Sequence, residues 1–329
     1  MTGLLAGAGF LREYGARVEA IARDQECEIE TIALPEDPEA RLPPEDTARI
    51  EVAYFSDDVY PDSSPAFFAA AFAAAKLRWM HCFNAGTDHP IFARLVERGV
   101  CLTNSPGGSA PPIAQTAIAG LLSLARRLPL FAAAQHERRW VEQGAVEPPP
   151  DLADQTLVVI GLGGIGSEIA RLARALGMRV VGVRPRPREP GDRVDELVTP
   201  ERLDEVLPRA DWLAIACPLS EATRGWIDAA ALGRLPAGAH LLNVARGEIV
   251  DETALIRALR SGRLAGAYLD VFAEEPLPAA SPLWELPNVI VTPHAASISA
   301  GNRVRQAEMF LANLERWARG EALANVVDA

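Results

Sequence analysis

The chain has 329 residues, of which 49% are hydrophobic, and a formal net charge of -12. Its length and apolar content predict two domains with ample core, and its negative charge argues against a nucleic-acid partner, which normally needs a basic face. The first residues lack the basic start of a signal peptide, so none is expected, and no apolar run reaches the roughly 20 residues of a membrane span. A soluble cytoplasmic protein without a membrane partner is therefore expected.

Short apolar runs alternate with helical patterns from the start of the chain to Asn104. This alternation predicts a parallel sheet with helices on its faces. The first element is ambiguous, because residues 4–8 make a poor strand and a helical pattern follows them. The later strands are expected at 29–34, 50–55, 77–82 and 100–102, and the helices at 64–75 and 91–98.

The segment from Asn104 to Pro111 is rich in glycine and proline, which is typical of a domain boundary. A long amphipathic helix is expected from Pro111 and Pro112, since proline is tolerated in a first helical turn. Pro129 interrupts or restarts this helix, and a proline-rich loop then leads to the next strand.

A strand, a glycine turn and a helix follow one another from residue 157. The turn reads GLGGIG, with Gly161, Gly163 and Gly166 in the three positions of GxGxxG and with Gly164 and Ile165 between them. The hexapeptide alone is often a plain turn. A buried strand before it, an amphipathic helix after it and a second strand at 180–183 identify a βαβ unit whose backbone N–H groups approach a pyrophosphate. The sequence therefore predicts a dinucleotide-binding Rossmann domain.

Arg184 stands where NAD-binding sites place an acidic residue for the ribose hydroxyls, and Arg186 and Arg188 follow it. An arginine here favours the 2′-phosphate of NADP through a charge-assisted contact of about 1.5–3 kcal/mol. NADP is therefore the expected cofactor, with NAD as the second choice. The alternative is a solvated basic loop that Pro185 and Pro187 keep extended.

The α/β pattern resumes after this loop and fits one doubly wound domain. Helix starts are expected at Thr199, whose helix would run to Leu207, and at Asp228 and Asp251, which would cap theirs. A final helix is expected at 299–319. The strands are expected at 194–198, 212–216, 239–243, 265–271 and 289–291.

Ionisable residues follow three of these strands. Arg246 follows 239–243, Glu274 and Glu275 follow 265–271, and His294 follows 289–291. Ligands of an open parallel sheet bind at the carboxyl ends of its strands, so these groups are expected at one edge. Each alone has a simpler explanation as a surface cation, a solvated turn or a packed ring.

No metal site is expected. Cys27, Cys82, Cys101 and Cys217 are far apart in the sequence and lack the spacing of metal ligands. They are therefore expected to be reduced thiols that pack in the interior.

Four stretches, GLGGIG, NVARGEIVDETALIRAL, GAYLDVFAEEPLP and NVIVTPHAA, closely resemble the D-isomer-specific 2-hydroxyacid dehydrogenase family, in particular its NADP-preferring glyoxylate/hydroxypyruvate reductases. The resemblance implies an α/β fold of two doubly wound parallel-sheet domains. A Rossmann domain, 105–295, would be inserted in a flavodoxin-like substrate domain formed by 1–104 and 296–329. The resemblance also implies a homodimer.

The resemblance assigns roles to individual residues. Arg246, Glu275 and His294 would be catalytic, and Asp270 would reach the nicotinamide carboxamide. In the segment Asn84–Asp88, the backbone N–H groups of Ala85 and Gly86 would bind the substrate carboxylate, and Trp140 would reach the site of a partner subunit. The remaining cofactor-binding residues would be Cys217, Pro218 and Thr223 on the adenosine side, together with Val244 and Ala245.

The implied reaction is hydride transfer between NADP(H) and a small substrate. The substrate is a 2-oxo acid, such as glyoxylate or hydroxypyruvate, in one direction and a D-2-hydroxy acid in the other. Arg246 would hold the carboxylate and polarise the ketone, and His294 would donate a proton. Two alternatives stay open: phosphite oxidation on the same scaffold, and a dinucleotide-sensing corepressor-like protein. Formate oxidation is disfavoured, because such enzymes usually carry Gln where Glu275 stands.

Overall fold

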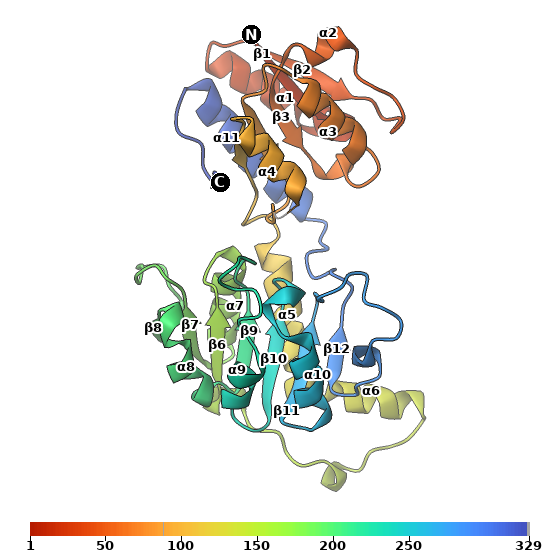
Figure 1. Ribbon diagram of the computed structural model, residues 1–329, viewed down its shortest axis with the longest axis vertical. Coiled ribbons are helices and arrows are strands. Elements are labelled where there is room, and N and C mark those ends of the chain that lie inside the picture. The colour runs from red at the N-terminus through yellow and green to blue at the C-terminus, as the bar shows by residue number, and fades with distance from the viewer. Residues whose placement is uncertain (88, 328–329) are drawn as a thin grey trace. The chain divides into compact units, whose positions relative to one another are not determined.

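The computed structural model describes residues 1–87 and 89–327, so Asp88 of the expected substrate segment lies outside it. The chain forms two compact units, Met1–Ser109 with the segment from Ser299 onward, and Ala110–Ile298 (Figure 1). We call them the substrate unit and the Rossmann unit. Each is an α/β structure built on a parallel sheet, and the predicted fold class is confirmed.

The unit boundaries differ by a few residues from those expected at 104/105 and 295/296. The first crossing comes later because the Arg305 Nε donates to the Gly108 carbonyl oxygen at 2.6 Å, which holds that segment to the substrate unit. The second also comes later, because the backbone N–H of Ala296 donates to Asp270 of the Rossmann unit at 3.0 Å.

The substrate unit has a five-stranded parallel sheet of order β2-β1-β3-β4-β5. Its ambiguous first element is a strand, β1, which pairs with β2 on one side and β3 on the other. Figure 1 shows the C-terminal helix α11 beside α1 in this unit. The elements are β1 (Thr2–Gly7), α1 (Ala8–Asp24), β2 (Ile29–Leu34), α2 (Pro44–Thr47), β3 (Ile50–Phe55), α3 (Ser64–Ala73), β4 (Trp79–Cys82), α4 (Pro90–Glu97), β5 (Cys101–Thr103) and α11 (Asn302–Ala318).

Apolar side chains cover both faces of this sheet, as the period of two along each strand requires. Leu4 of β1 and Tyr54 of β3 pack with Phe310 of α11 in the cluster that also includes α1. Leu5 and Phe55 point the opposite way and pack in the cluster formed with α3 and α4.

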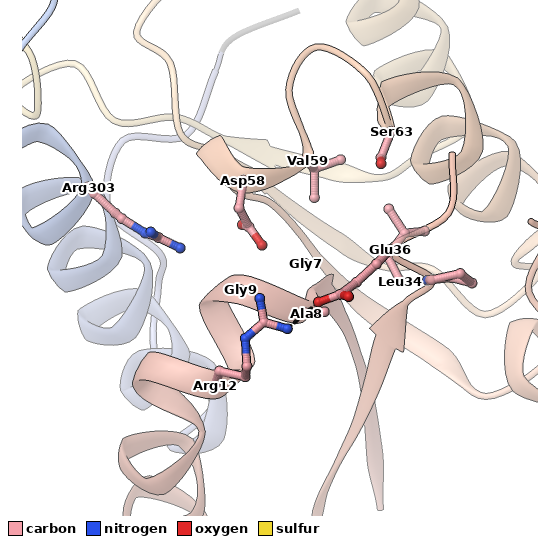
Figure 2. A pocket seen from close by; sticks show the side chains of 11 residues that line it. Gly7, Ala8, Gly9, Arg12, Leu34, Glu36, Asp58, Val59, Ser63 and Arg303 are labelled. Atoms are coloured by element: carbon pink, nitrogen blue, oxygen red, sulfur yellow. Dashed lines mark hydrogen bonds and ion pairs between the residues drawn. The ribbon is translucent and has the colours of Figure 1, made fainter. Parts of the chain in front are cut away.

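The N-terminus of α1 faces a cavity of about 290 Å³ at the carboxyl edge of this sheet (Figure 2). The carboxylate of Asp58 caps the helix by accepting from the Phe10 N–H at 3.2 Å. A Cβ on Gly7 or Gly9 would collide with that carboxylate, so a larger residue at either position would displace the Asp58 side chain. The positive end of the helix dipole is thus already matched by an anion of the chain itself.

The Rossmann unit has a seven-stranded parallel sheet of order β12-β11-β10-β9-β6-β7-β8. Helices α5 and α7 cover one face, and α8, α9 and α10 cover the other. The elements are α5 (Ala110–Ala125), α6 (Leu128–His136), β6 (Thr156–Ile160), α7 (Gly164–Ala175), β7 (Arg179–Val183), β8 (Glu196–Val198), α8 (Leu203–Val206), β9 (Trp212–Ile215), α9 (Ala229–Arg234), β10 (Ala239–Asn243), α10 (Glu252–Arg260), β11 (Leu264–Leu269) and β12 (Val289–Val291).

The helix expected from Thr199 to Leu207 is wrong in detail. A 3₁₀ turn at Pro200–Arg202 precedes the single turn of α8, and a second 3₁₀ turn, Leu207–Arg209, follows it. Pro208 has no N–H to continue the α-helical hydrogen bonding, which explains the early end. The caps expected at Asp228 and Asp251 are confirmed, since their side chains accept from Ala231 N and Ala254 N.

Among the described residues, no single helix is long and apolar enough to cross a membrane. Helices α5 and α6 meet that test only when taken together, and they are bent by 72° at the break between them.

Candidate active site

The three glycines of the GxGxxG turn lie in three different surroundings. Gly161 has φ 89°, and a Cβ there would lie 2.6 Å from the Cys217 backbone. A Cβ on Gly166 would overlap the Gly161 carbonyl oxygen, so this glycine allows α7 to pack closely on the strand. Gly163 faces open space, with nothing within 4 Å of an added Cβ. This is the position where a dinucleotide-binding turn lets the pyrophosphate approach the backbone.

A cavity of about 720 Å³ opens at this turn. Its lining comes from the carboxyl ends of β6, β7, β8 and β9. The strand order of the sheet reverses between β6 and β9, which is the usual ligand position in such sheets. The lining brings together many of the residues predicted to bind the cofactor, namely Gly161, Gly163, Arg184, Arg186, Cys217, Pro218 and Thr223.

The other predicted cofactor residues lie outside this lining. Gly164, Ile165 and Gly166 form the first turn of α7. Val244 and Ala245 follow β10 and are buried. The Thr223 hydroxyl donates to the Pro218 carbonyl oxygen at 2.8 Å, so it shapes the wall of the cavity.

The Arg184 guanidinium is held by its own loop, and its contact with a 2′-phosphate stays a prediction. Asp192 accepts from Nη1 at 2.8 Å and from Nη2 at 2.7 Å. Nη2 also donates to the Pro187 carbonyl at 2.5 Å, and Nε to that of Arg186 at 3.3 Å. These four bonds leave one of the five guanidinium N–H groups unused.

Arg184 and Asp192 therefore clamp the arginine-rich loop into one shape. Their side chains are 11% and 6% exposed, a burial that favours a well-formed pair. The Glu189 N–H donates to Asp192 and, with the Arg184 guanidinium, holds the pKa of this carboxyl below its usual value. Arg188 donates to the Val194 carbonyl oxygen. Arg186 makes no side-chain hydrogen bond or ion pair within the part of the chain that the structure describes, and it lines the cavity.

His294 and Glu275 form a hydrogen-bonded pair. The His294 Nδ1 lies 2.8 Å from Glu275 Oε2, and Glu275 Oε1 accepts from the Phe272 N–H at 3.0 Å. Both carboxylate oxygens are thereby fixed. The imidazole is oriented with Nδ1 towards the carboxylate, which leaves Nε2 for a substrate. The half-exposed His294 side chain can be reached from solvent.

The segment carrying Arg246 is packed against the segment carrying Glu275. A Cβ on Gly247 would overlap the carbonyl group of Phe272, so only glycine permits this approach. Asn243 fixes the turn from its other side, because its amide donates to the Arg246 carbonyl oxygen at 3.0 Å and accepts from the Ala245 N–H at 3.1 Å. The structure thus brings the predicted Arg246 segment to the predicted acid–base pair.

Asp270 holds the segment that carries His294. Its Oδ1 accepts from Thr292 Oγ1 at 2.6 Å and from the N–H groups of Ala295 and Ala296 at 2.8 and 3.0 Å. Its backbone oxygen accepts from the His294 N–H at 2.8 Å. Asp270 is 3% exposed, and the sequence did not reveal this anchoring role, because its partners lie on another strand end.

The segment expected to bind the substrate carboxylate follows β4 in the substrate unit. Asn104 Nδ2 donates to the Ala85 carbonyl at 2.6 Å, and Asn84 Nδ2 to that of Gly86 at 2.5 Å. The N–H groups of Ala85 and Gly86 donate to no acceptor among the described residues. Sequence reasoning missed Asn104, which was considered only as part of a domain boundary.

Trp140 is 85% exposed and lies in the Rossmann unit, in the segment after α6. The assignment of this residue to a partner subunit stays a prediction.

Comparisons with known proteins identify the family of this chain. The model of the D-isomer specific 2-hydroxyacid dehydrogenase, NAD binding domain, matches residues 118–296. A glyoxylate reductase of Korarchaeum cryptofilum is 38% identical over 261 residues, which cover 78% of this chain and 77% of that protein. One of Aeropyrum pernix is 35% identical over 266 residues, covering 78% and 77%.

Solved structures of similar fold span both units. A D-isomer specific 2-hydroxyacid dehydrogenase from Xanthobacter autotrophicus, in complex with NADPH and MES, has a TM-score of 0.76 at 30% identity and covers 99% of this chain and 98% of its own. An NADPH-dependent glyoxylate/hydroxypyruvate reductase from Sinorhizobium meliloti, in complex with NADP and sulfate, has a TM-score of 0.74 at 27% identity, with the same coverage.

The chain belongs to the D-isomer specific 2-hydroxyacid dehydrogenase family. It is an NAD(P)-dependent oxidoreductase that transfers a hydride between its cofactor and a 2-oxo or 2-hydroxy acid. The family resemblance found in the sequence is thereby confirmed.

Proposed function

We propose that this protein reduces glyoxylate or hydroxypyruvate with NADPH as its preferred cofactor. The observation that carries the proposal is the His294–Glu275 pair, whose geometry leaves the imidazole Nε2 for a substrate oxygen. The nature of the substrate is supported by the relatives named glyoxylate reductase and by the structural neighbour named glyoxylate/hydroxypyruvate reductase.

The residues of the chain supply positioning and charge. The cofactor, when bound, supplies the hydride, and reduction of the ketone places negative charge on its oxygen. His294 donates a proton to that oxygen from Nε2, and Glu275 stabilises the imidazolium through Nδ1. Arg246 holds the carboxylate and polarises the ketone with its planar set of donors. The N–H groups of Ala85 and Gly86 bind the substrate carboxylate, and Asp270 holds the His294 segment in place.

The preference for NADPH is proposed to rest on Arg186, with help from the one unused N–H of Arg184. Arg186 lines the cavity and brings a positive charge that no described carboxylate pairs. Two structural neighbours contain NADPH or NADP, which supports this proposal. Glu189 and Glu201 also line the cavity. Their negative charges repel the 2′-phosphate and so reduce the preference for NADPH. NADH is therefore proposed to be accepted as well, with lower affinity than NADPH.

We also propose a homodimer that works in the cytoplasm. Exposed apolar side chains gather on α6 and the segment that follows, at Leu128, Leu130, Phe131 and Trp140, which are 51%, 41%, 41% and 85% exposed. Such a surface is typical of a protein interface. All four cysteines are free thiols, which suits a reducing compartment.

The test is a set of initial rates with NADPH and NADH over glyoxylate, hydroxypyruvate, pyruvate, larger 2-oxo acids and, in the oxidising direction, phosphite. We expect the highest kcat/KM with NADPH as cofactor and either glyoxylate or hydroxypyruvate as substrate. Tight dinucleotide binding without turnover would favour the sensor, and phosphite-dependent reduction of NADP would favour the second enzyme class.

A further inference from the structure

We propose that His81, on β4 of the substrate unit, is a positioning residue that holds the substrate-carboxylate segment through Ser105. The inference rests on the proposed function in one respect, the binding of the carboxylate by Ala85 and Gly86. Its structural basis is a chain of hydrogen bonds between buried side chains.

The chain of hydrogen bonds has a defined start and end. Trp79 Nε1 lies 2.8 Å from Thr103 Oγ1, which lies 2.7 Å from His81 Nδ1. On the other side of the ring, Nε2 lies 2.9 Å from Ser105 Oγ, which donates to the Cys82 carbonyl oxygen at 3.2 Å. Trp79, His81, Thr103 and Ser105 are all 0% exposed, so water cannot replace a lost partner from the surface.

One assignment of the protons satisfies all of these partners at once. An indole N–H only donates and a carbonyl oxygen only accepts. Thr103 therefore accepts from Trp79 and gives its own proton to His81 Nδ1, and the neutral ring carries its proton on Nε2, from which it donates to Ser105. Burial lowers the pKa of His81 to about 3, which agrees with a neutral ring.

The end of this chain reaches the substrate segment. The Ser105 N–H donates to the Asn84 carbonyl oxygen at 3.2 Å, and the neighbouring Asn104 donates to the Ala85 carbonyl at 2.6 Å. Both donors lie in the segment that follows β5, and His81 contacts the Ser105 side chain. A shift of Ser105 would therefore turn the peptide groups of the segment in which the Ala85 and Gly86 N–H groups are proposed to bind the substrate carboxylate.

The two ring nitrogens have different tasks, which gives a matched pair of variants. In His81→Asn the amide can replace Nδ1 and accept from Thr103, but it is too short to reach Ser105. In His81→Gln the longer amide can replace Nε2 and donate to Ser105, but it loses the bond to Thr103. Each variant loses one buried hydrogen bond, and only the first loses the bond on the side of the substrate segment.

The experiment measures KM for glyoxylate, inhibition by oxalate, the Kd for NADPH and Tm for both variants. We expect His81→Asn to raise KM and the oxalate inhibition constant about tenfold, the effect of one weakened charge-assisted hydrogen bond. The Kd for NADPH should not change, and His81→Gln should stay within about threefold of wild type. Equal effects in both variants, or a change in Tm alone, would overturn the proposal.

A second pair of variants removes the dependence on His81 itself. Ser105→Ala breaks the chain on the substrate side and Thr103→Val breaks it on the far side, so only Ser105→Ala should raise KM. Amide hydrogen exchange at residue 105, whose N–H donates to the Asn84 carbonyl oxygen, reports the same difference without turnover. If wild type reduces no 2-oxo acid, the proposed function fails. Faster exchange in Ser105→Ala alone would still support the positioning role, and equal exchange would refute it.

Discussion

Arg186→Ala is the variant that most directly tests how this protein selects its cofactor. The four hydrogen bonds of Arg184 to its own loop leave that residue one N–H for a phosphate, so Arg186 must carry most of the attraction. A hydrogen bond between charged groups contributes about 1.5–3 kcal/mol. This corresponds to a loss of about ten- to a hundred-fold in NADPH affinity, since 1.4 kcal/mol is a factor of ten.

The assay compares the Kd for NADPH and for NADH, from the change in cofactor fluorescence on binding, at two salt concentrations. NADPH binding should weaken as stated and lose part of its salt dependence, because screening acts on the removed charge. NADH binding should change less than about twofold. Arg188→Ala is the matched control, since this guanidinium donates to the Val194 carbonyl, and its NADPH affinity should fall less than about threefold.

The reasoning is refuted if Arg186→Ala weakens NADPH and NADH alike, or if Arg188→Ala has the larger effect. A third variant, Arg184→Ala, separates the clamp from the phosphate contact. It leaves the buried Asp192 without its partner, so it should weaken both cofactors by disordering the loop. A loss confined to NADPH would show that Arg184 itself reads the phosphate.

Three further predictions follow from the site and the core. His294→Ala should lower kcat by about 10²- to 10⁴-fold, the usual contribution of a general acid, while the Kd for NADPH, measured in a binding titration, stays unchanged. An equal loss of cofactor binding would contradict its role as the acid. Asp270→Ala should leave buried N–H donors without an acceptor and lower Tm by roughly 4–8 °C, for about 2 kcal/mol in a domain of this size; an unchanged melting curve would exclude the anchoring role. Because the pKa of His81 is about 3 in the folded chain and about 6.5 in an unfolded one, only the unfolded state gains its proton as pH falls below 6.5, and stability should drop by up to about 1.4 kcal/mol per pH unit. The free energy of unfolding, measured with urea between pH 6.5 and 5, should depend less steeply on pH in His81→Gln than in wild type. The same dependence on pH in both proteins would contradict this.

The parts of the molecule that local patterns determine could be predicted from the sequence. The βαβ unit around Gly161 is one example, because strand, turn and helix follow each other without interruption and each has its own periodicity. The placement of Arg246 and His294 is another, since both follow strands of one parallel sheet. The edge at which they lie is fixed by strand direction alone.

Features that depend on partners distant in the sequence could not be predicted. The Arg184–Asp192 pair forms only because the loop between the two residues folds back on itself. Neither the residue types nor their spacing predicts that conformation of the loop. The His81 chain joins side chains of two neighbouring strands, and its residues are separated by more than twenty positions. The strand β1 was ambiguous, because its short run of apolar residues and glycine shows no alternation, as is usual for a strand buried on both faces.

The two sheets of this chain use the point where strand order reverses in opposite ways. In the Rossmann unit the reversal lies between β6 and β9, and a Cβ added to Gly163, the N-cap of α7, would meet nothing within 4 Å in the described part of the chain. In the substrate unit it lies between β1 and β3, and Asp58 occupies the helix N-terminus that follows β1 (Figure 2). The same arrangement of strand, turn and helix therefore occurs twice. In the Rossmann unit the helix N-terminus is open for the proposed pyrophosphate, and in the substrate unit a carboxylate of the chain itself accepts a hydrogen bond at the helix N-terminus.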